Sequence, residues 1–385
     1  MAGIYIHIPF CRQACTYCNF HFSTSLARKD LFLDMLNKEI QHETNFLPAG
    51  SAIETIYIGG GTPSLLSTRE LETLLTNLRN KFSVKQDAEI TLEANPDNIH
   101  PQVLREWRQL GINRLSLGVQ SFSDEELKWM NRAHTASESL ASIDEILQAG
   151  FDNFSVDLIF GSPYLSNETL EHNLELLFRR SVPHLSCYAL TVEPRTALDH
   201  MVKSNKSKPV DPEKQATQFL LLMQAMKANG YEQYEISNYA KPGMRSKHNS
   251  AYWKGKAYAG FGPSAHSYNG ISSRRWNVAN NSMYIQSLRE DVIPYEEEIL
   301  SPTQQLNEYI MTSLRTIEGM DLQQIKIRSS DVHVQIIQRS VEPFIRSGKM
   351  IFEAGNITLT DEGKLFADGI ASDLFFTDED GDAGI

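Results

Sequence analysis

The sequence contains only four cysteines among 385 residues, and it lacks both a long apolar run and an excess of positive charge. So few cysteines exclude a disulfide framework in a chain of this length and indicate a reducing compartment, the cytoplasm. No apolar stretch reaches the roughly 18 residues of a membrane-spanning helix, so only peripheral membrane contact is compatible with the sequence. The formal net charge of −12 has the wrong sign for a protein that binds a phosphate backbone. Nucleic acid is therefore not expected as a partner.

The chain also lacks a G-x-G-x-x-G segment after its first predicted strand, which argues against a dinucleotide-binding fold. Its first half instead alternates between short β-rich runs and segments of helical period. Strands are predicted at 3–8, 53–58, 88–93, 113–119, 153–160 and 184–191, and helices at 30–44, 68–80, 100–110, 135–149 and 167–180. This alternation predicts parallel βαβ units, in either an open doubly wound sheet or a complete or partial barrel. Because polar and glycine residues gather just after the strands, we favour a barrel-like α/β sheet.

The character of the sequence changes after about residue 295. Residues 303–317 have a helical pattern, and 350–370 read as a hairpin that turns at Gly355-Asn356 and leads into a helix. These features outline a small α+β unit of winged-helix type. We therefore predict a sheet domain at 1–240, a connecting segment at 241–298, a C-terminal domain at 299–376 and an acidic, disordered tail at 377–385.

Three of the four cysteines lie within eight residues, in the pattern Cys11-x3-Cys15-x2-Cys18. Structural zinc normally takes four ligands, and only Cys187 remains, inside an apolar strand where a buried core thiol is expected. A four-iron cluster held by three thiolates keeps one iron open to a small molecule. The spacing favours this interpretation over a zinc site or a group of unreactive buried thiols.

Glycines and carboxylates stand at the predicted strand ends. The bare backbone of Gly59–Pro63 could approach a ligand closely, or it could serve only a tightly packed turn. Glu93 ends one strand, and Asp157 lies within the apolar strand 153–160. A buried carboxylate is costly without a partner, so each should face a cation or a hydroxyl, or else form a structural salt bridge.

The cysteine pattern, with an aromatic residue at Tyr17, resembles the signature of radical SAM proteins. The wider resemblance is to the branch that contains oxygen-independent coproporphyrinogen III oxidase, and it covers essentially the whole chain. It rests on YIHIPFC (5–11), GGGTPS (59–64), LEANPD (92–97), SLGVQSF (116–122), MNRAH (130–134) and VDLIFGSP (156–163). The resemblance implies a partial (β/α)6 TIM-like barrel, followed by a HemN-type domain at 299–376.

The same resemblance implies the cofactors. A [4Fe–4S] cluster would bind Cys11, Cys15 and Cys18, and S-adenosylmethionine (SAM) would chelate the open iron through its amino and carboxylate groups. Electron transfer would then split the sulfonium into methionine and a 5′-deoxyadenosyl radical. The residues that the resemblance assigns to SAM are Tyr5, Tyr17, Gly60, Gly61, Thr62, Glu93, Gln120, Arg132 and Asp157, with Arg132 facing a carboxylate and Asp157 facing hydroxyls.

One position departs from the oxidases of this branch. They carry a further cysteine where this chain has Phe20, so decarboxylation of coproporphyrinogen is not expected. The segment KHNSAYWKG (247–255) resembles instead the H-N-x-x-Y-W motif of the heme chaperones called HemW. An exposed imidazole at His248 could ligate iron, and Tyr252 and Trp253 could stack on a macrocycle. Alternatively, His248 and Asn249 cap a turn and Trp253 lies in the core.

We therefore expect a heme chaperone that binds a [4Fe–4S] cluster, SAM and heme, and that transfers heme to an acceptor protein. An electron donor for the cluster is a further expected partner, and SAM cleavage is an expected capability. The alternative is a true enzyme, either the oxygen-independent coproporphyrinogen III oxidase or another radical reaction on a tetrapyrrole. His266, in the glycine-rich stretch 260–267, is a second but weaker candidate for a heme ligand.

Overall fold

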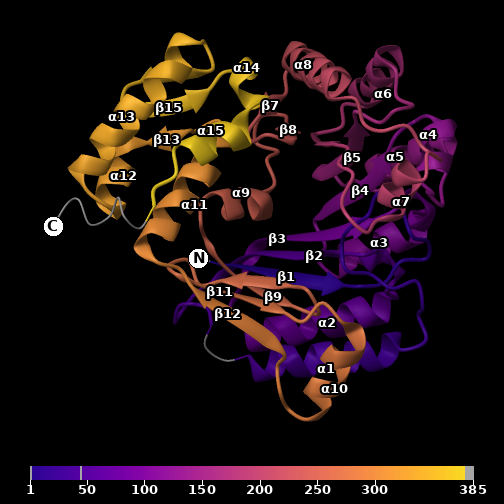
Figure 1. Ribbon diagram of the computed structural model, residues 1–385. Helices are drawn as coiled ribbons and strands as arrows, with labels where there is room; N and C mark the ends of the chain where they lie inside the picture. The colour runs from indigo at the N-terminus through magenta and orange to yellow at the C-terminus, as the bar shows by residue number, and fades with distance from the viewer. Residues whose placement is uncertain (1, 44–45, 378–385) are drawn as a thin grey trace.

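The computed structural model describes residues 2–43 and 46–377. Figure 1 shows one large sheet flanked by helices, with a smaller C-terminal unit beside it. The first residue of the predicted acidic tail, Thr377, is described, and the rest of that tail lies outside the described residues. The domain boundaries at 240, 298 and 376 stay predictions.

Six parallel strands form the middle of the large sheet, in sequence order. They are β1 (Ala2–Ile8), β2 (Ile53–Gly60), β3 (Val84–Ala94), β4 (Arg114–Gln120), β5 (Phe154–Phe160) and β6 (His184–Ala189). Each pairs with the next in parallel register, which confirms the predicted βαβ units. Sequential parallel strands place all their carboxyl ends at one edge of the sheet, where barrel enzymes carry their sites.

Helices connect these strands and cover the outer face. The predicted ones are confirmed as α1 (Lys29–His42), α2 (Thr68–Lys81), α3 (Pro101–Gln109), α5 (Ala136–Gln148) and α6 (Asn167–Arg179). The N-termini of α2 and α5 are fixed by local contacts, because Ser67 and Thr135 each form a capping box with the glutamate three residues later. Further helices of this part are α4 (Asp124–Trp129), α7 (Ala197–Lys203), α8 (Pro212–Ala228), α9 (Lys247–Trp253) and α10 (Asn281–Arg289).

Strand β1 illustrates how the sheet divides core from site. Ile4, Ile6 and Ile8 are fully buried in the main hydrophobic core, which the helices close from outside. The alternate residues Tyr5 and His7 line a cavity on the inner face instead. Since side chains alternate across a strand, packing the isoleucines against the helices directs these two polar rings inward.

The sheet extends beyond the six predicted strands at both edges. Strand β9 (Ala257–Phe261) pairs in parallel with the free side of β1, and three antiparallel strands continue from it, β10 (His266–Tyr268), β11 (Ser273–Asn277) and β12 (Tyr295–Ile299). At the other edge, β8 (Asn238–Ala240) pairs with β6 and carries β7 (Glu232–Gln233). The segment predicted as a connector thus contributes four strands to a 12-stranded sheet.

The C-terminal unit has its own hydrophobic core and a three-stranded antiparallel sheet. Its elements are α11 (Pro302–Leu314), β13 (Met320–Asp321), α12 (Leu322–Arg328), α13 (Asp331–Arg346), β14 (Met350–Glu353), β15 (Asn356–Leu359), α14 (Asp361–Lys364) and α15 (Ala367–Asp373). The predicted hairpin is confirmed, but it turns at Ala354-Gly355, where both residues have positive φ, one position earlier than expected.

Candidate functional site

The three predicted cluster ligands lie on the loop between β1 and α1. Cys11, Cys15 and Cys18 are half-buried and unpaired, whereas Cys187 is buried in β6 as a core thiol. Backbone hydrogen bonds tie the loop to the body of the protein at several points. The Cys11 amide donates to the Ser23 carbonyl at 3.0 Å, and the Thr16 amide donates to the Met130 carbonyl at 3.1 Å. The loop therefore holds its thiols in a defined conformation.

The thiols influence one another and share one nearby cation. Burial raises the pKa of Cys11 and raises that of Cys18 to about 11, and the neighbouring thiols add to both shifts while Arg132 opposes them. Nη1 of Arg132 lies 3.2 Å from the sulfur of Cys15, and its other amino group donates to Asn95 Oδ1 at 2.7 Å. A fixed positive charge beside three thiols suits an anionic thiolate cluster.

No three His, Cys, Asp or Glu side chains within residues 2–43 and 46–377 lie close enough together to hold a single metal ion. A four-iron cluster makes a different demand, because each of its ligands meets a separate iron atom. Three unpaired, half-buried thiols on one tethered loop, beside the half-buried guanidinium of Arg132, fit that demand.

The glycine loop at the end of β2 packs against the strand that leads to the cysteines. The Gly61 amide donates to the Ile8 carbonyl at 2.9 Å, and the Thr62 amide donates to the Phe10 carbonyl at 2.7 Å. A Cβ atom on Gly61 would lie 2.6 Å from the Phe10 carbonyl oxygen, and Gly60 has a φ of +112°. The glycines thus have a clear packing role, and ligand contact by them stays a prediction.

Glu93 and Asp157 are carboxylates on the inner face of the sheet, and neither forms an ion pair with any described residue. Glu93 accepts hydrogen bonds from the Tyr57 hydroxyl at 2.7 Å and from the Gly60 amide at 3.0 Å. Burial raises the pKa of Glu93 to about 7 and that of Asp157 to about 6. The predicted alternative of a structural salt bridge is therefore not realised at either position. Both carboxyls are suited to receive a cation or hydroxyls from a ligand.

The remaining residues predicted to contact SAM surround these carboxyls from several elements. Gln120 ends β4 at an irregularity in the strand pairing and has a φ of +73°, an uncommon conformation for a residue other than glycine. Tyr17 packs against the small hydrophobic cluster of Met130, Ile159 and their neighbours. The Tyr5 hydroxyl lies 3.0 Å from Nδ1 of His7. Their roles toward a cofactor stay predictions.

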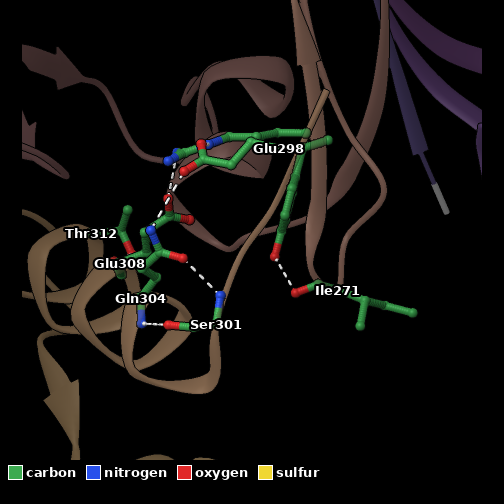
Figure 2. A network of polar contacts seen from close by, with 8 residues as sticks. Ile271, Glu298, Ser301, Gln304, Glu308 and Thr312 are labelled. Atoms are coloured by element: carbon green, nitrogen blue, oxygen red, sulfur yellow. Dashed lines mark hydrogen bonds and ion pairs between the residues drawn. The ribbon is translucent and has the colours of Figure 1, made fainter. Parts of the chain in front are cut away.

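A cavity of about 870 Å³, here called the outer cavity, lies between the sheet and the C-terminal unit. Its walls come from the cysteine loop (residues 19–21), β1, β9 to β11, α9, α11 and α12. One wall contains the polar network of Figure 2, in which Glu298 and Glu308 both receive hydrogen bonds from the guanidinium of Arg274. This network joins the last strands of the sheet to α11.

His248 differs from the expectation of an exposed imidazole, since only 2% of its surface is accessible. Its Nδ1 lies 2.7 Å from Thr55 Oγ1 and its Nε2 lies 2.8 Å from the Tyr252 hydroxyl, while the Tyr57 ring stacks on it at 5.1 Å. Burial lowers its pKa to about 3. Helix α9 is capped by Ser246, not by His248. The imidazole is a buried, fully hydrogen-bonded group.

The two aromatic residues of the motif, Tyr252 and Trp253, face the outer cavity. Tyr252 lines both this cavity and a smaller inner cavity of about 170 Å³, whereas Trp253 lines only the outer one. The inner cavity also contains Arg114, whose guanidinium is buried without a hydrogen bond or ion pair to any described residue. Sequence reasoning missed Arg114, although a charge at the start of the apolar strand 113–119 was a usable signal, as it was for Asp157.

Two segments of the chain match known protein families. Residues 5–177 match the Radical SAM superfamily, and residues 300–366 match the HemN C-terminal domain. Curated relatives cover nearly the whole chain. The chain is 32% identical over 373 residues to the heme chaperone HemW of Bacillus subtilis, covering 96% of this chain and 98% of the relative. It is also 32% identical to the heme chaperone HemW of Escherichia coli, covering 96% of each.

The chain belongs to the HemW family of radical SAM proteins. Among solved structures, coproporphyrinogen III oxidase (HemN) from Escherichia coli is similar, with a TM-score of 0.84 and 24% identity over 97% of this chain and 90% of that one. This likeness establishes a shared fold, a sheet of radical SAM type with a small C-terminal domain. For HemW-family members, the superfamily implies a [4Fe–4S] cluster and SAM. Within the described ranges, no helix is long and apolar enough to cross a membrane.

Proposed function

We propose that this HemW-family chain is a heme chaperone, which binds heme in the outer cavity and transfers it to an acceptor protein. The observation that carries the proposal is the position of the cavity directly beside the cysteine loop. Asn19, Phe20 and His21, which follow Cys18, form part of the cavity wall. A macrocycle bound there would lie next to the cluster loop.

For the cluster, Cys11, Cys15 and Cys18 are the proposed ligands. Bound there, the cluster would supply single electrons to the group at its fourth iron. The chain's own contribution is to tether the loop and to hold Arg132 against Cys15, which stabilises negative charge on the sulfur. A separate electron donor is a proposed partner. We expect the protein to act in the cytoplasm, because thiolates stay reduced there.

For SAM, the proposed contacts are the strand-end residues around Glu93 and Asp157. Glu93 would accept hydrogen bonds from an ammonium group, and Asp157 would accept them from hydroxyls, since neither forms a direct ion pair with a described residue. Arg132 would meet a carboxylate. The remaining proposed contacts, which would complete the enclosure of SAM, are Tyr5, Tyr17, Gly60, Gly61, Thr62 and Gln120.

For heme, the outer cavity has a volume within the range of small-molecule sites and presents aromatic side chains on several sides. Tyr252 and Trp253 of the H-N-x-x-Y-W segment line it, which supports their proposed contact with the macrocycle. Phe20 is 68% exposed and also lines the cavity, so an apolar ring occupies the place of the further cysteine of the oxidases. His248 would act through its contact with Tyr252, as a positioning residue.

The proposal is tested with full-length protein whose cluster has been reconstituted anaerobically. Hemin is titrated against it while the Soret band is followed, and we expect a saturable shift with about one hemin per chain. Phe20→Ala should weaken hemin binding without changing the iron content. In a parallel sample, coproporphyrinogen III is supplied with SAM and a reductant. Formation of vinyl-bearing product, or failure to shift the Soret band, would overturn the chaperone proposal.

A further inference from the structure

Three histidines line the outer cavity, and they differ in whether their ring nitrogens are available. His7 has both nitrogens engaged, with Nδ1 3.0 Å from the Tyr5 hydroxyl and Nε2 2.9 Å from the His21 carbonyl oxygen. His21 has its Nε2 2.7 Å from Asn281 Oδ1. His266 forms no hydrogen bond through either ring nitrogen to any described residue, so it alone among the three has both nitrogens open.

His248, the histidine of the H-N-x-x-Y-W segment, is not an alternative ligand in this geometry. It lines only the inner cavity, and both of its ring nitrogens are hydrogen-bonded, to Thr55 and Tyr252. Ligation of iron by His248 would require at least one of these buried hydrogen bonds to break and a hydroxyl to lose its partner. Leaving a buried polar group unpaired is costly.

The setting of His266 suits a metal ligand. It lies on β10 directly opposite Trp276 of β11, and the two rings stack with centroids 6.2 Å apart and an interplanar angle of 29°. This contact orients the imidazole without using a nitrogen. Burial, and to a lesser extent the nearby Arg274, lowers the pKa of His266. The ring is therefore neutral at physiological pH, the state in which an imidazole ligates a metal.

The arginines of the cavity also differ in their partners. Arg245 is paired with Glu232 and Glu318, and Arg274 is paired with two further glutamates. Arg328, on α12, forms no ion pair with a residue in the described part of the chain. Its guanidinium lies 4.8 Å from the centroid of the Tyr309 ring. It is thus a cation at the cavity wall that no carboxylate of the described chain neutralises.

We propose that His266 ligates the iron of heme bound in the outer cavity and that Arg328 receives a heme propionate. The inference rests on the proposed function and adds the ligand and the orientation of the macrocycle. Iron would meet an imidazole nitrogen on the β10 side, and the carboxylate edge would face Arg328 of α12. Imidazole is a common axial ligand of heme, and guanidinium groups bind carboxylates in charge-assisted pairs.

The test titrates hemin against the full-length wild-type protein and against His266→Ala, His248→Ala and His172→Ala. His172 is an exposed histidine on α6 outside both cavities and serves as the matched control. We expect His266→Ala to raise the hemin Kd about tenfold or more and to lose the spectrum of imidazole-ligated heme. Free imidazole should restore that spectrum in His266→Ala, which a purely structural role would not allow. His172→Ala should keep both the affinity and the spectrum, whereas His248→Ala should weaken hemin binding through the lost contact with Tyr252 but keep the imidazole-ligated spectrum.

The propionate contact is tested by comparing hemin with hemin dimethyl ester. Arg328→Ala should weaken hemin binding several-fold and leave ester binding unchanged. If His266→Ala is poorly folded by circular dichroism, His266→Gln replaces it, with the same expected loss of ligation. If wild-type protein binds no hemin, the proposed function itself fails. If wild type binds hemin and the His266 variants keep the wild-type spectrum, or only His248→Ala loses it, this ligand assignment is overturned while the proposed function stands.

Discussion

The guanidinium of Arg132 lies 3.2 Å from the sulfur of Cys15, so a residue just after α4 contacts the cysteine loop 117 positions earlier in the chain. The same side chain donates to Asn95 Oδ1 and, at 2.6 Å, to the Gly118 carbonyl oxygen. Because it bridges the ends of β3 and β4 to the loop, it couples the thiols to the region of the Glu93 and Asp157 carboxyls. A planar guanidinium provides donors in several directions at once, which a lysine ammonium does not do in the same geometry.

We predict that Arg132→Met lowers iron retention after anaerobic desalting and raises the SAM Kd by about tenfold or more, since loss of a buried charged partner costs about 2–4 kcal/mol. Arg132→Lys should have intermediate effects on iron retention and SAM affinity, because lysine keeps the positive charge but lacks the several donors of the planar guanidinium. The measurements are iron per chain and equilibrium SAM binding. Arg108→Met is the control, since Arg108 likewise donates to two carbonyls, at the end of α5 and away from the site. Equal effects of the Arg108 and Arg132 variants would contradict the prediction.

We predict that Gly61→Ala displaces the strand that leads to Cys11. The added Cβ would lie 2.6 Å from the Phe10 carbonyl oxygen, a backbone atom that cannot move away alone. The unfolding free energy should fall by roughly 2–4 kcal/mol, as measured by chemical denaturation, and iron retention should fall with it.

The control for this change is Gly369→Ala in α15, where nothing lies within 4 Å of the new Cβ. Alanine in a helix should leave stability unchanged or raise it by up to about 1 kcal/mol. Loss of iron in the Gly369 variant, or full iron retention in the Gly61 variant, would show that the close packing of Gly61 against Phe10 has no bearing on the loop.

We predict that SAM affinity rises with pH through the titration of Glu93. Burial first, and Asp157 second, raise the pKa of Glu93 to about 7, so below that value the group is mostly a neutral acid. A neutral acid is a poorer partner for an ammonium group, and one linked proton changes the affinity by up to about tenfold per pH unit. Binding to anaerobically reconstituted protein is measured at pH 6, 7 and 8.

Glu93→Gln is the control for the ionisation of the ligand itself, which remains in that variant while the titration of residue 93 is gone. We expect the variant to bind more weakly at pH 8 and to show a shallower pH dependence than the wild type. Identical slopes for the two proteins would mean that Glu93 does not titrate in the binding reaction.

We predict that Glu39 sets part of the pH dependence of folding stability. This buried residue of α1 accepts hydrogen bonds from the Gly262 amide at 2.8 Å, the Asn277 amide and the Tyr284 hydroxyl. Burial raises its pKa from 4.5 to about 7. Because the folded-state pKa is raised, its stabilising contribution is fully present below pH 4.5 and is lost as the pH rises through about 7.

Urea denaturation of wild type and Glu39→Gln at pH 5 and pH 8 measures this contribution. The wild type should lose stability relative to Glu39→Gln between the two values, by up to about 3 kcal/mol. Glu39→Ala should be less stable than the wild type at pH 5 by about 2–4 kcal/mol, since three buried donors lose their acceptor. A wild type and a Glu39→Gln variant with the same pH dependence would contradict the raised pKa of Glu39.

Sequence alone determined much of this protein because the relevant signals are local. Short β-rich runs predicted β1 to β6. The capping boxes that begin α2 and α5 join residues only three positions apart, so these helix starts are also set locally. The spacing of Cys11, Cys15 and Cys18 lies within one loop, and it indicated an iron–sulfur site before any packing was known. These features depend on neighbours a few positions apart.

Tertiary structure decided what depends on distant segments meeting. Strand β9 was not predictable, because it completes its pairing with β1, some 255 positions earlier in the chain. The motif around His248 suggested an exposed imidazole, but contact with Thr55 across 193 positions buries it. The same long-range packing leaves both nitrogens of His266 open at the cavity. Whether a histidine is a core residue or a ligand depends on the free energy of burial and hydrogen bonding, which is settled only when the chain has folded.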